Sequence, residues 1–158
     1  MGDRKPGSAE ERRYADASRA VRQFLALPRG DDPQVHAIGP LRHAAKYHRA
    51  FGRVEEWIDV TGFLVIMDDQ HVAHALRRHG SLRSEAKRGQ IGLERDDFAR
   101  LPQILGDPDT DESGDKGRRG GPAAVVTKVI GGVRYRVIVE VRARQRQIAF
   151  VSMFKVRV

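Results

Sequence analysis

Histidine is the side chain best suited to moving protons near neutral pH, and the first half of this chain contains six histidines. His74 and His79 fall in one segment whose apolar residues have helical spacing. Placed opposite a basic surface, either imidazole could transfer the proton of an RNA 2′-hydroxyl group, which is general acid–base catalysis. The alternative interpretation is that His74 or His79 simply caps or lines its helix.

The histidines also raise the hypothesis of a metal site. His71 could pair with His74, or His43 with His48. The sequence contains no Cys and no HExxH motif, however, and no carboxylate stands in an obvious ligand pattern beside these pairs. We therefore predict no metal site and no other cofactor.

A second chemical signal is the alternation of side-chain types in the strand-like segment 133–142. Its apolar face would carry Val133, Tyr135, Val137, Val139 and Val141. Its other face would carry Arg134, Arg136, Ile138, Glu140 and Arg142. Such alternation predicts one buried face and one face in water. Glu140 beside Arg142 is typical of an acid or base next to a phosphate-binding guanidinium, although an ordinary charged surface would read the same way.

Lys128 is placed by the turn that precedes this segment. Gly131 and Gly132 form a two-residue β-hairpin signal, which pairs residue 128 with residue 135. Lys128 would then lie on the apolar Tyr135 face. Its amine either extends to an edge of the sheet or points into a cleft beneath the sheet.

Positive charge is concentrated at the C-terminal end of the chain. From Gly121 to Val158 there are eight Lys or Arg residues and one acid, which gives +7 of the net charge of +8. A basic surface built on strands predicts a polyanionic partner, most commonly a nucleic acid. The residues that we expect to contact nucleic acid are Arg134, Arg136, Arg144, Arg146 and Lys155.

Composition limits the class of protein. With 158 residues and 40% apolar side chains, the chain can form one cored domain with an extension. The lack of Cys excludes disulfides and thiolate metal sites. No apolar run approaches the length of a membrane span, and the N-terminus lacks the apolar stretch of a signal peptide. We expect a soluble protein that does not associate with membranes.

The N-terminal segment predicts one helix followed by a break. Ser8 and Glu11 have capping-box spacing, which indicates a helix over about 9–27, and a segment rich in Pro, Gly and Asp follows it. We interpret residues 1–32 as a helical leader or linker that is partly disordered. Residues 33–158 would form the domain itself.

The remaining pattern predicts helices first and strands last. The expected elements are a helix within 36–51 after Pro40, a strand within 57–66, a helix over 69–79 capped by Asp68 and Asp69, a short strand at 91–93, a helix over 95–105 interrupted by Pro102, a mobile loop at 106–122, and strands over 123–130, 133–142 and 147–156. This order predicts an α+β fold in which N-terminal helices pack on one face of a C-terminal antiparallel sheet.

The segment from about residue 34 to 158 resembles a known family as a whole. The motifs that carry the resemblance are His74-x4-His79-Gly80, Gly89-Gln90-x-Gly92, Asp96-Asp97-Phe98-x-x-Leu101-Pro102-x-Ile104, Asp107-Pro108-Asp109, Thr127-Lys128, Tyr135-x-Val137-x-x-Glu140-x-Arg142 and Ser152-Met153-Phe154-Lys155. In order and spacing they are similar to the phage-borne nuclease-like domains of the barnase–EndoU–colicin–RelE superfamily. Such domains occur in phage head-morphogenesis proteins and in bacterial polymorphic toxins.

The resemblance implies a metal-independent ribonuclease with N-terminal helices and a four-stranded antiparallel sheet. It also implies active groups on a helix His, a strand Lys or Arg, and a Ser or Thr of the last strand. Carried over by position, and with Glu140 added from the strand alternation, the candidate catalytic residues are His74, His79, Lys128, Glu140, Arg142 and Ser152. Ser152 stands where Thr is more usual in the family, and Gln90 matches a step to which no role is assigned.

Two functions are compatible with these observations. The first is an endoribonuclease of toxin type, in which the 2′-hydroxyl attacks the adjacent phosphate. The second is a non-catalytic nucleic-acid-binding module of a phage structural protein. For the first we expect RNA as partner, an acidic immunity or antitoxin protein as a second partner, and the cytoplasm of the producing or target bacterium as location, with delivery by a virion or a secretion system.

Overall fold

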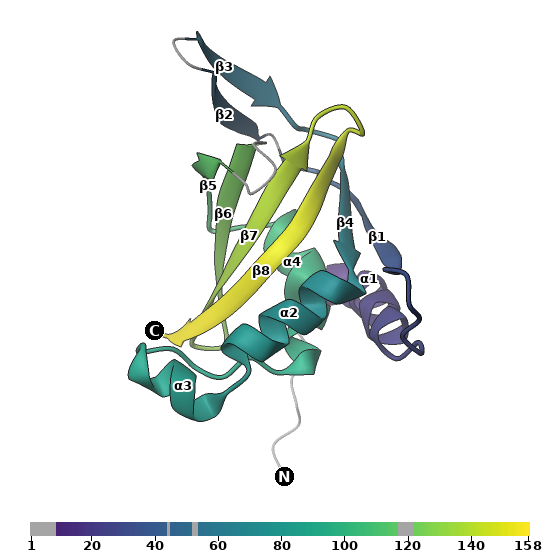
Figure 1. Ribbon diagram of the computed structural model, residues 1–158, viewed down its shortest axis with the longest axis vertical. Coiled ribbons are helices and arrows are strands. Elements are labelled where there is room, and N and C mark those ends of the chain that lie inside the picture. The colour runs from purple at the N-terminus through teal and green to yellow at the C-terminus, as the bar shows by residue number, and fades with distance from the viewer. Residues whose placement is uncertain (1–8, 44, 52–53, 117–121) are drawn as a thin grey trace.

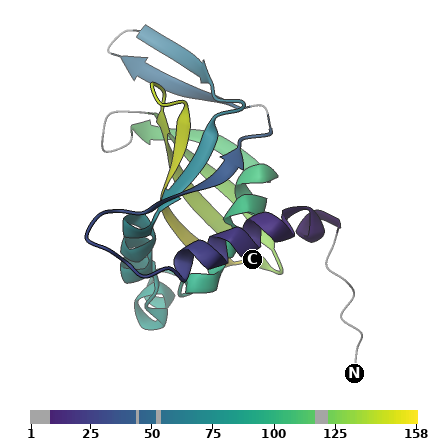
Figure 2. The same cartoon turned by 90° about the vertical axis from the view of Figure 1, so that its right-hand side faces the viewer.

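The chain folds into a six-stranded sheet with helices packed against it (Figures 1 and 2). The computed structural model describes residues 9–43, 45–51, 54–116 and 122–158. Its elements, in chain order, are α1 (Ala9–Leu25), β1 (Val35–Pro40), β2 (Lys46–Phe51), β3 (Val54–Asp59), β4 (Leu64–Asp68), α2 (Asp69–His79), α3 (Leu82–Lys87), the 3-10 helix η1 (Arg95–Arg100), α4 (Leu101–Gly106), β5 (Thr110–Lys116), β6 (Pro122–Ile130), β7 (Val133–Arg142) and β8 (Gln147–Arg157). The predicted α+β class is confirmed.

The strand order of the main sheet is β1-β4-β8-β7-β6-β5, and β2 and β3 form a separate two-stranded sheet. All neighbours in the main sheet are antiparallel except β4 and β8, which run parallel. The three consecutive C-terminal strands form the meander that the sequence predicts. The sheet is wider than the four strands that the resemblance implies, because β1, β4 and β5 join it.

The core lies between the sheet and the layer formed by α1, η1 and α4. The apolar face of β7, which includes Val137 and Val139, is buried as the alternation predicts. Phe98 of η1 and Phe150 of β8 meet across this interface, with ring centroids 5.7 Å apart and ring planes nearly perpendicular. Figure 2 shows α1 and α4 on one side of the sheet and α2 with α3 on the other.

Helix α1 is part of this core. Val21, Phe24 and Leu25 are buried in the same apolar cluster as the sheet residues, and Arg22 donates a hydrogen bond of 2.9 Å to Asp96. That bond lowers the pKa of the Asp96 carboxyl group below its usual value. The helix was predicted correctly, but it packs into the domain, so the boundary that we expected near residue 33 does not separate a linker from a domain.

Helix α2 begins where the sequence indicates. Asp68 is its N-cap and accepts a hydrogen bond from the backbone N–H of His71, and Gly80 follows its last residue. The predicted helix over 95–105 is also confirmed, as two short pieces: η1 ends at Arg100, and α4 places Pro102 in its first turn, where proline is tolerated.

Four segment predictions were wrong. The strand expected within 57–66 is divided between the end of β3 and the start of β4 by a turn. The short strand expected at 91–93 is a single bridge between Ile91 and Lys155. The helix expected after Pro40 is not found in the described residues, because residues 46–51 form β2 and pair with β3, while β1 lies before that point. Part of the predicted loop at 106–122 is strand β5, which pairs with β6 at the edge of the sheet. An edge strand can be polar because only one side of it is paired, and polar composition therefore did not reveal it. Residues 117–121 lie outside the described part of the chain.

The hairpin between β6 and β7 forms as predicted. Ile130 pairs with Val133 and Lys128 with Tyr135, and the turn glycines Gly131 and Gly132 have φ of 57° and 77°. Both values favour glycine. In the described residues, no helix combines the length and the apolar character needed to cross a membrane.

The position of α1 predicts that its apolar side is required for stability. Replacing Phe24 by Ala should lower the free energy of unfolding by about 3–5 kcal/mol, because a buried aromatic ring leaves a cavity. Chemical denaturation followed by circular dichroism measures this change. Arg19→Ala, on the exposed side of the same helix, is the control and should stay within about 0.5 kcal/mol of the unmodified protein. Equal stability of both variants would show that α1 is not part of the core.

Candidate active site on the open face of the sheet

The sheet face opposite α1 and α4, which we call the open face, carries most of the predicted site residues. Paired residues of neighbouring antiparallel strands point to the same face, so the register divides it into cross-strand rungs. The successive rungs on this face are Arg142 with Gln147, Ala123–Glu140–Ala149, Val125–Ile138–Ser152, and Thr127–Arg136–Phe154. Adjacent rungs are about 6.6 Å apart along a strand.

Glu140 lies between two alanines in its rung. The side chain is 7% exposed, which corrects the expectation that it lies in water. Among the described residues no hydrogen bond or ion pair of its carboxylate is found, and neither of its oxygens is among the buried atoms left without a partner. The residue is therefore largely buried while its carboxylate group keeps contact with solvent. Its neighbours in the rung, Ala123 and Ala149, are small. A carboxylate that is accessible on the open face can accept a proton from a substrate.

Arg142 lies one rung from Glu140 on the same strand. Its side chain is half-buried, and its Nε is buried with no hydrogen-bond partner in the described chain. The terminal nitrogens of the same guanidinium are not among the buried atoms that lack a partner, and they are the donors from which a phosphate oxygen could accept.

Ser152 lies one rung from Glu140 in the other direction, opposite Ile138. The register of β7 and β8 shifts at this point, because Val139 pairs with Phe150 and leaves Val151 as an extra residue. Such a bulge re-aims the neighbouring side chains and is common next to active sites. Ser152 is half-buried.

His79 lies at the next rung, against the side chain of Phe154. Its ring centroid lies 5.7 Å from that of Phe154, which pairs with Arg136. The Nδ1 atom of His79 is 3.2 Å from Oε2 of Glu85, and Glu85 is fully buried. Arg88 donates a hydrogen bond of 3.3 Å to the other oxygen of Glu85. Because Nδ1 is bound to Glu85, Nε2 is the ring nitrogen left for a substrate.

Lys128 is separated from these residues by the sheet itself. Its amine is buried on the helix side, donates a hydrogen bond of 2.7 Å to the carbonyl oxygen of Asp107, and lies 3.7 Å from Asp109. Of the two alternatives, the one that places it beneath the sheet is confirmed. This amine holds the connection between α4 and β5 and does not face Glu140 or Arg142.

Lys155 is likewise on the helix side, which contradicts its expected role in contacting nucleic acid. It forms an ion pair of 2.9 Å with Asp97 and is buried. Tyr135 donates a hydrogen bond of 3.2 Å to the same carboxylate. Burial, together with the charge of Asp97, raises the pKa of Tyr135 to about 12. The three side chains form a polar cluster inside the domain.

The other predicted residues lie at the surface. His74 is exposed on α2 and is not grouped with His79, since five residues of a helix separate the two by more than one turn. Arg136 is exposed on the open face, and Arg134 is partly buried at its end. Arg144 and Arg146 are exposed in the β7–β8 turn, where Arg146 lies 5.1 Å above the Phe63 ring.

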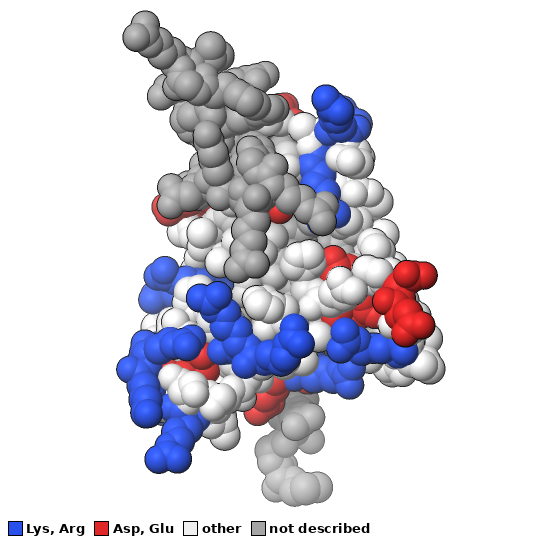
Figure 3. Space-filling view, in the orientation of Figure 1, with Lys and Arg blue, Asp and Glu red and all other residues white. Residues whose placement is uncertain are grey.

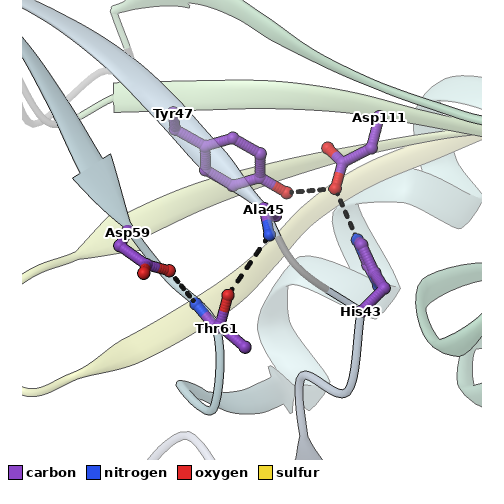
Figure 4. Close-up of polar contacts among 6 residues, drawn as sticks. All are labelled: His43, Ala45, Tyr47, Asp59, Thr61 and Asp111. Carbon is purple, nitrogen blue, oxygen red and sulfur yellow. Dashed lines mark hydrogen bonds and ion pairs between the residues drawn. The ribbon is translucent and has the colours of Figure 1, made fainter.

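A second polar cluster, which the sequence did not indicate, lies where the β1–β2 connection meets β5 (Figure 4). Oδ2 of Asp111 is 2.7 Å from Nε2 of His43 and accepts a hydrogen bond of 3.0 Å from Tyr47. Tyr47 is buried, and burial together with Asp111 raises its pKa well above the usual value. The cluster joins two segments that are far apart in the sequence. The sequence suggested His48 as a second metal ligand beside His43, but the His48 side chain lies outside the described part of the structure.

Among the described residues, no group of three or more His, Cys, Asp or Glu side chains is arranged to hold a metal ion. The chemistry available on the open face is that of a carboxylate, a guanidinium, a hydroxyl and an imidazole. Glu85 is the one member of this arrangement that sequence reasoning missed. In the sequence Glu85 is simply a carboxylate six residues after His79, with the end of one helix and the start of the next between them. That spacing does not determine whether the two side chains meet.

Comparison with known proteins identifies the family of the chain. Residues 55–157, roughly two-thirds of the chain, match the family model described as phage-Barnase-EndoU-ColicinE5/D-RelE like nuclease 3. No curated protein and no solved structure matches the chain. The matched region includes β7, β8 and α2, which carry Glu140, Arg142, Ser152 and His79. The chain belongs to the phage-Barnase-EndoU-ColicinE5/D-RelE like nuclease 3 family, and its general function is that of a nuclease.

Proposed function

We propose that this protein is a metal-independent endoribonuclease whose reaction centre is the Ser152 rung of the open face. The observation that carries the proposal is that Ser152 lies between an acid and an imidazole on this face. Glu140 is one rung away on one side. On the other side, one rung away, is Phe154, and the His79 ring lies against it. A phosphate over Ser152 would have a carboxylate and an imidazole on opposite sides. That is the arrangement that in-line proton transfer requires.

The reaction transfers one proton at each side of the phosphorus. Glu140 takes the proton from the 2′-hydroxyl, and the 2′-oxygen forms a bond to phosphorus. The bond from phosphorus to the 5′-oxygen breaks, and that oxygen receives a proton from Nε2 of His79. The products are a 2′,3′-cyclic phosphate and a free 5′-hydroxyl. Arg142 donates hydrogen bonds to the phosphate oxygens, whose negative charge grows in the transition state.

Glu85 supports this role of His79. A carboxylate bound to Nδ1 fixes the ring orientation and stabilises the protonated imidazole that the reaction needs at the start. Ser152 is within reach of the same phosphate as a hydroxyl donor. Lys128 and His74 have no part in the proposed centre, because the first lies beneath the sheet and the second is exposed elsewhere on α2.

The alternative function is a module that binds nucleic acid without cleaving it. It needs the basic surface but not the His79–Glu85 pair or the unpartnered carboxylate of Glu140. A carboxylate on the surface that meets the phosphates would weaken the binding of a polyanion and gains nothing without catalysis, and we therefore favour the enzyme.

The deciding experiment compares RNA with DNA of the same sequence in the presence of EDTA. We expect RNA fragments that end in 2′,3′-cyclic phosphate, and no cleavage of DNA or of RNA whose 2′-hydroxyls are methylated. Binding without products would establish the alternative. Cleavage of both polymers, or cleavage abolished by the chelator, would rule out the mechanism.

Glu140→Gln should reduce the rate of RNA cleavage by about 10²–10⁴-fold, because the amide cannot accept the 2′-hydroxyl proton. The substitution keeps the size of the side chain, and circular dichroism checks that the fold is retained. Asp16→Asn, on the exposed side of α1, removes the same charge and should cleave at the unmodified rate. A Glu140→Gln enzyme with full activity would exclude this residue as the base.

Arg142→Ala should slow cleavage by roughly 10²–10³-fold through lost stabilisation of the phosphate charge, and His79→Ala by at least roughly tenfold through loss of the acid. Single-turnover rates measured over a pH series separate the two effects. Loss of His79 should change the shape of the pH profile because the proton donor is removed, whereas Arg142→Ala should leave the shape unchanged. If both variants cleave at the unmodified rate, the proposed centre is wrong.

A further inference from the structure

A band of positive charge covers α2 and α3, the two helices on the same side of the sheet as the open face (Figure 2). Its exposed members are Arg77, Arg78, Arg83, Lys87 and Arg88. Between residues 70 and 90 the only acid is Glu85, which is fully buried and bound to His79 and Arg88. Figure 3 shows Lys and Arg side chains gathered across the lower part of the molecule, over these two helices.

At one end of this band the surface is hollowed between α2 and the segment that follows α1. The hollow has a volume of about 430 Å³ and is lined by Arg29, Gln70, His71, His74 and Arg77. Gln70, His74 and Arg77 are spaced four and three residues apart and so share one side of the helix. Arg29 faces them from the α1–β1 connection.

The lining groups are nearly all hydrogen-bond donors or potential cations. Two guanidiniums, two imidazoles and one amide surround the hollow, and no carboxylate is among the described residues that line it. Two acids lie beside the hollow and both have partners. The Asp68 carboxylate is bound to the backbone N–H and Nδ1 of His71, which leaves Nε2 of His71 for another partner. Asp69, which lines the adjoining hollow with Arg29, accepts a hydrogen bond from the backbone N–H of Gln34. Guanidinium groups opposed across a hollow of this kind suit the oxygens of a phosphate.

We propose that this hollow binds a backbone phosphate of the RNA substrate, away from the bond that is cut. The proposal rests on the proposed ribonuclease function and defines the substrate as a single strand several nucleotides long. His74 and His79 are five residues apart on α2, which is about 7.5 Å along the helix axis and about 140° around it. A strand whose scissile phosphate lies near His79 must therefore pass around α2 to place another phosphate between Arg29 and Arg77, which requires a substrate of several nucleotides.

The binding test uses a short single-stranded RNA with methylated 2′-hydroxyls, which cannot be cleaved by 2′-hydroxyl attack. Fluorescence anisotropy over a series of salt concentrations should show that the double variant Arg29→Ala/Arg77→Ala binds roughly three- to tenfold more weakly than the unmodified protein. The slope of log affinity against log salt should fall by about 0.7, as expected for one lost phosphate contact on a single strand. The control Arg12→Ala/Arg19→Ala removes the same charge from exposed positions of α1 and should change neither quantity.

The cleavage test compares a dinucleotide with a longer RNA. The dinucleotide has one phosphate, which occupies the reaction centre, so the double variant should cleave it at the unmodified rate. On the longer RNA its KM should rise by the same factor as the loss of binding, with kcat unchanged. Equal binding by the two double variants, or an equal loss on both substrates, would overturn the subsite. If the unmodified protein cleaves neither substrate, the ribonuclease proposal fails, and the anisotropy measurement still decides whether the hollow binds RNA phosphate.

Discussion

The alternation of side chains along β7 is the constraint on which the rest of the structure depends. A strand has two faces only, so burying Val137 and Val139 against η1 and α4 forces Glu140 and Arg142 onto the opposite face. The register with β6 and β8 then decides their neighbours: two alanines beside Glu140 and a bulge next to Ser152. Shifting β7 by one residue would exchange the two faces and remove both the core and the site.

The charged groups buried in this domain are of two kinds, and the contrast separates structure from chemistry. Lys128 and Lys155 each have oxygen partners within 3 Å on the helix side. Their desolvation is offset by those contacts, as expected of groups that hold the fold together. In the described chain Nε of Arg142 is buried without a partner, and Glu140 is largely buried with no ion pair or hydrogen bond found for its carboxylate. Both groups lie on the open face, where a substrate could supply the missing contacts.

The parts of the site that the sequence predicts are those set by local spacing. The two-residue turn at Gly131–Gly132 and the alternation of β7 give the faces of Lys128, Glu140 and Arg142 directly, and the Asp68 cap gives the start of α2. Contacts that depend on the packing of distant segments were not predictable, such as Asp107 over Lys128. The basic band on α2 and α3 was also missed, because net charge was summed along the chain, where acids of other segments cancel it. The helix expected after Pro40 was wrong because Lys46–Phe51 is fixed as a strand by its pairing with β3, which local helix signals do not reveal.

The first 54 residues lie outside the family match, yet they complete the same sheet and core. β1 pairs with β4 and covers an edge that would otherwise be open to association with other chains. At the opposite edge, His43 and Tyr47 bind Asp111 of β5, so the β1–β2 connection reaches across the domain. β5 is the direct neighbour of β6, and β6 carries Ala123, which pairs with Glu140. The described part of the N-terminal segment therefore contacts both edges of the sheet that holds the proposed reaction centre, and the folded unit extends beyond the family-matched residues.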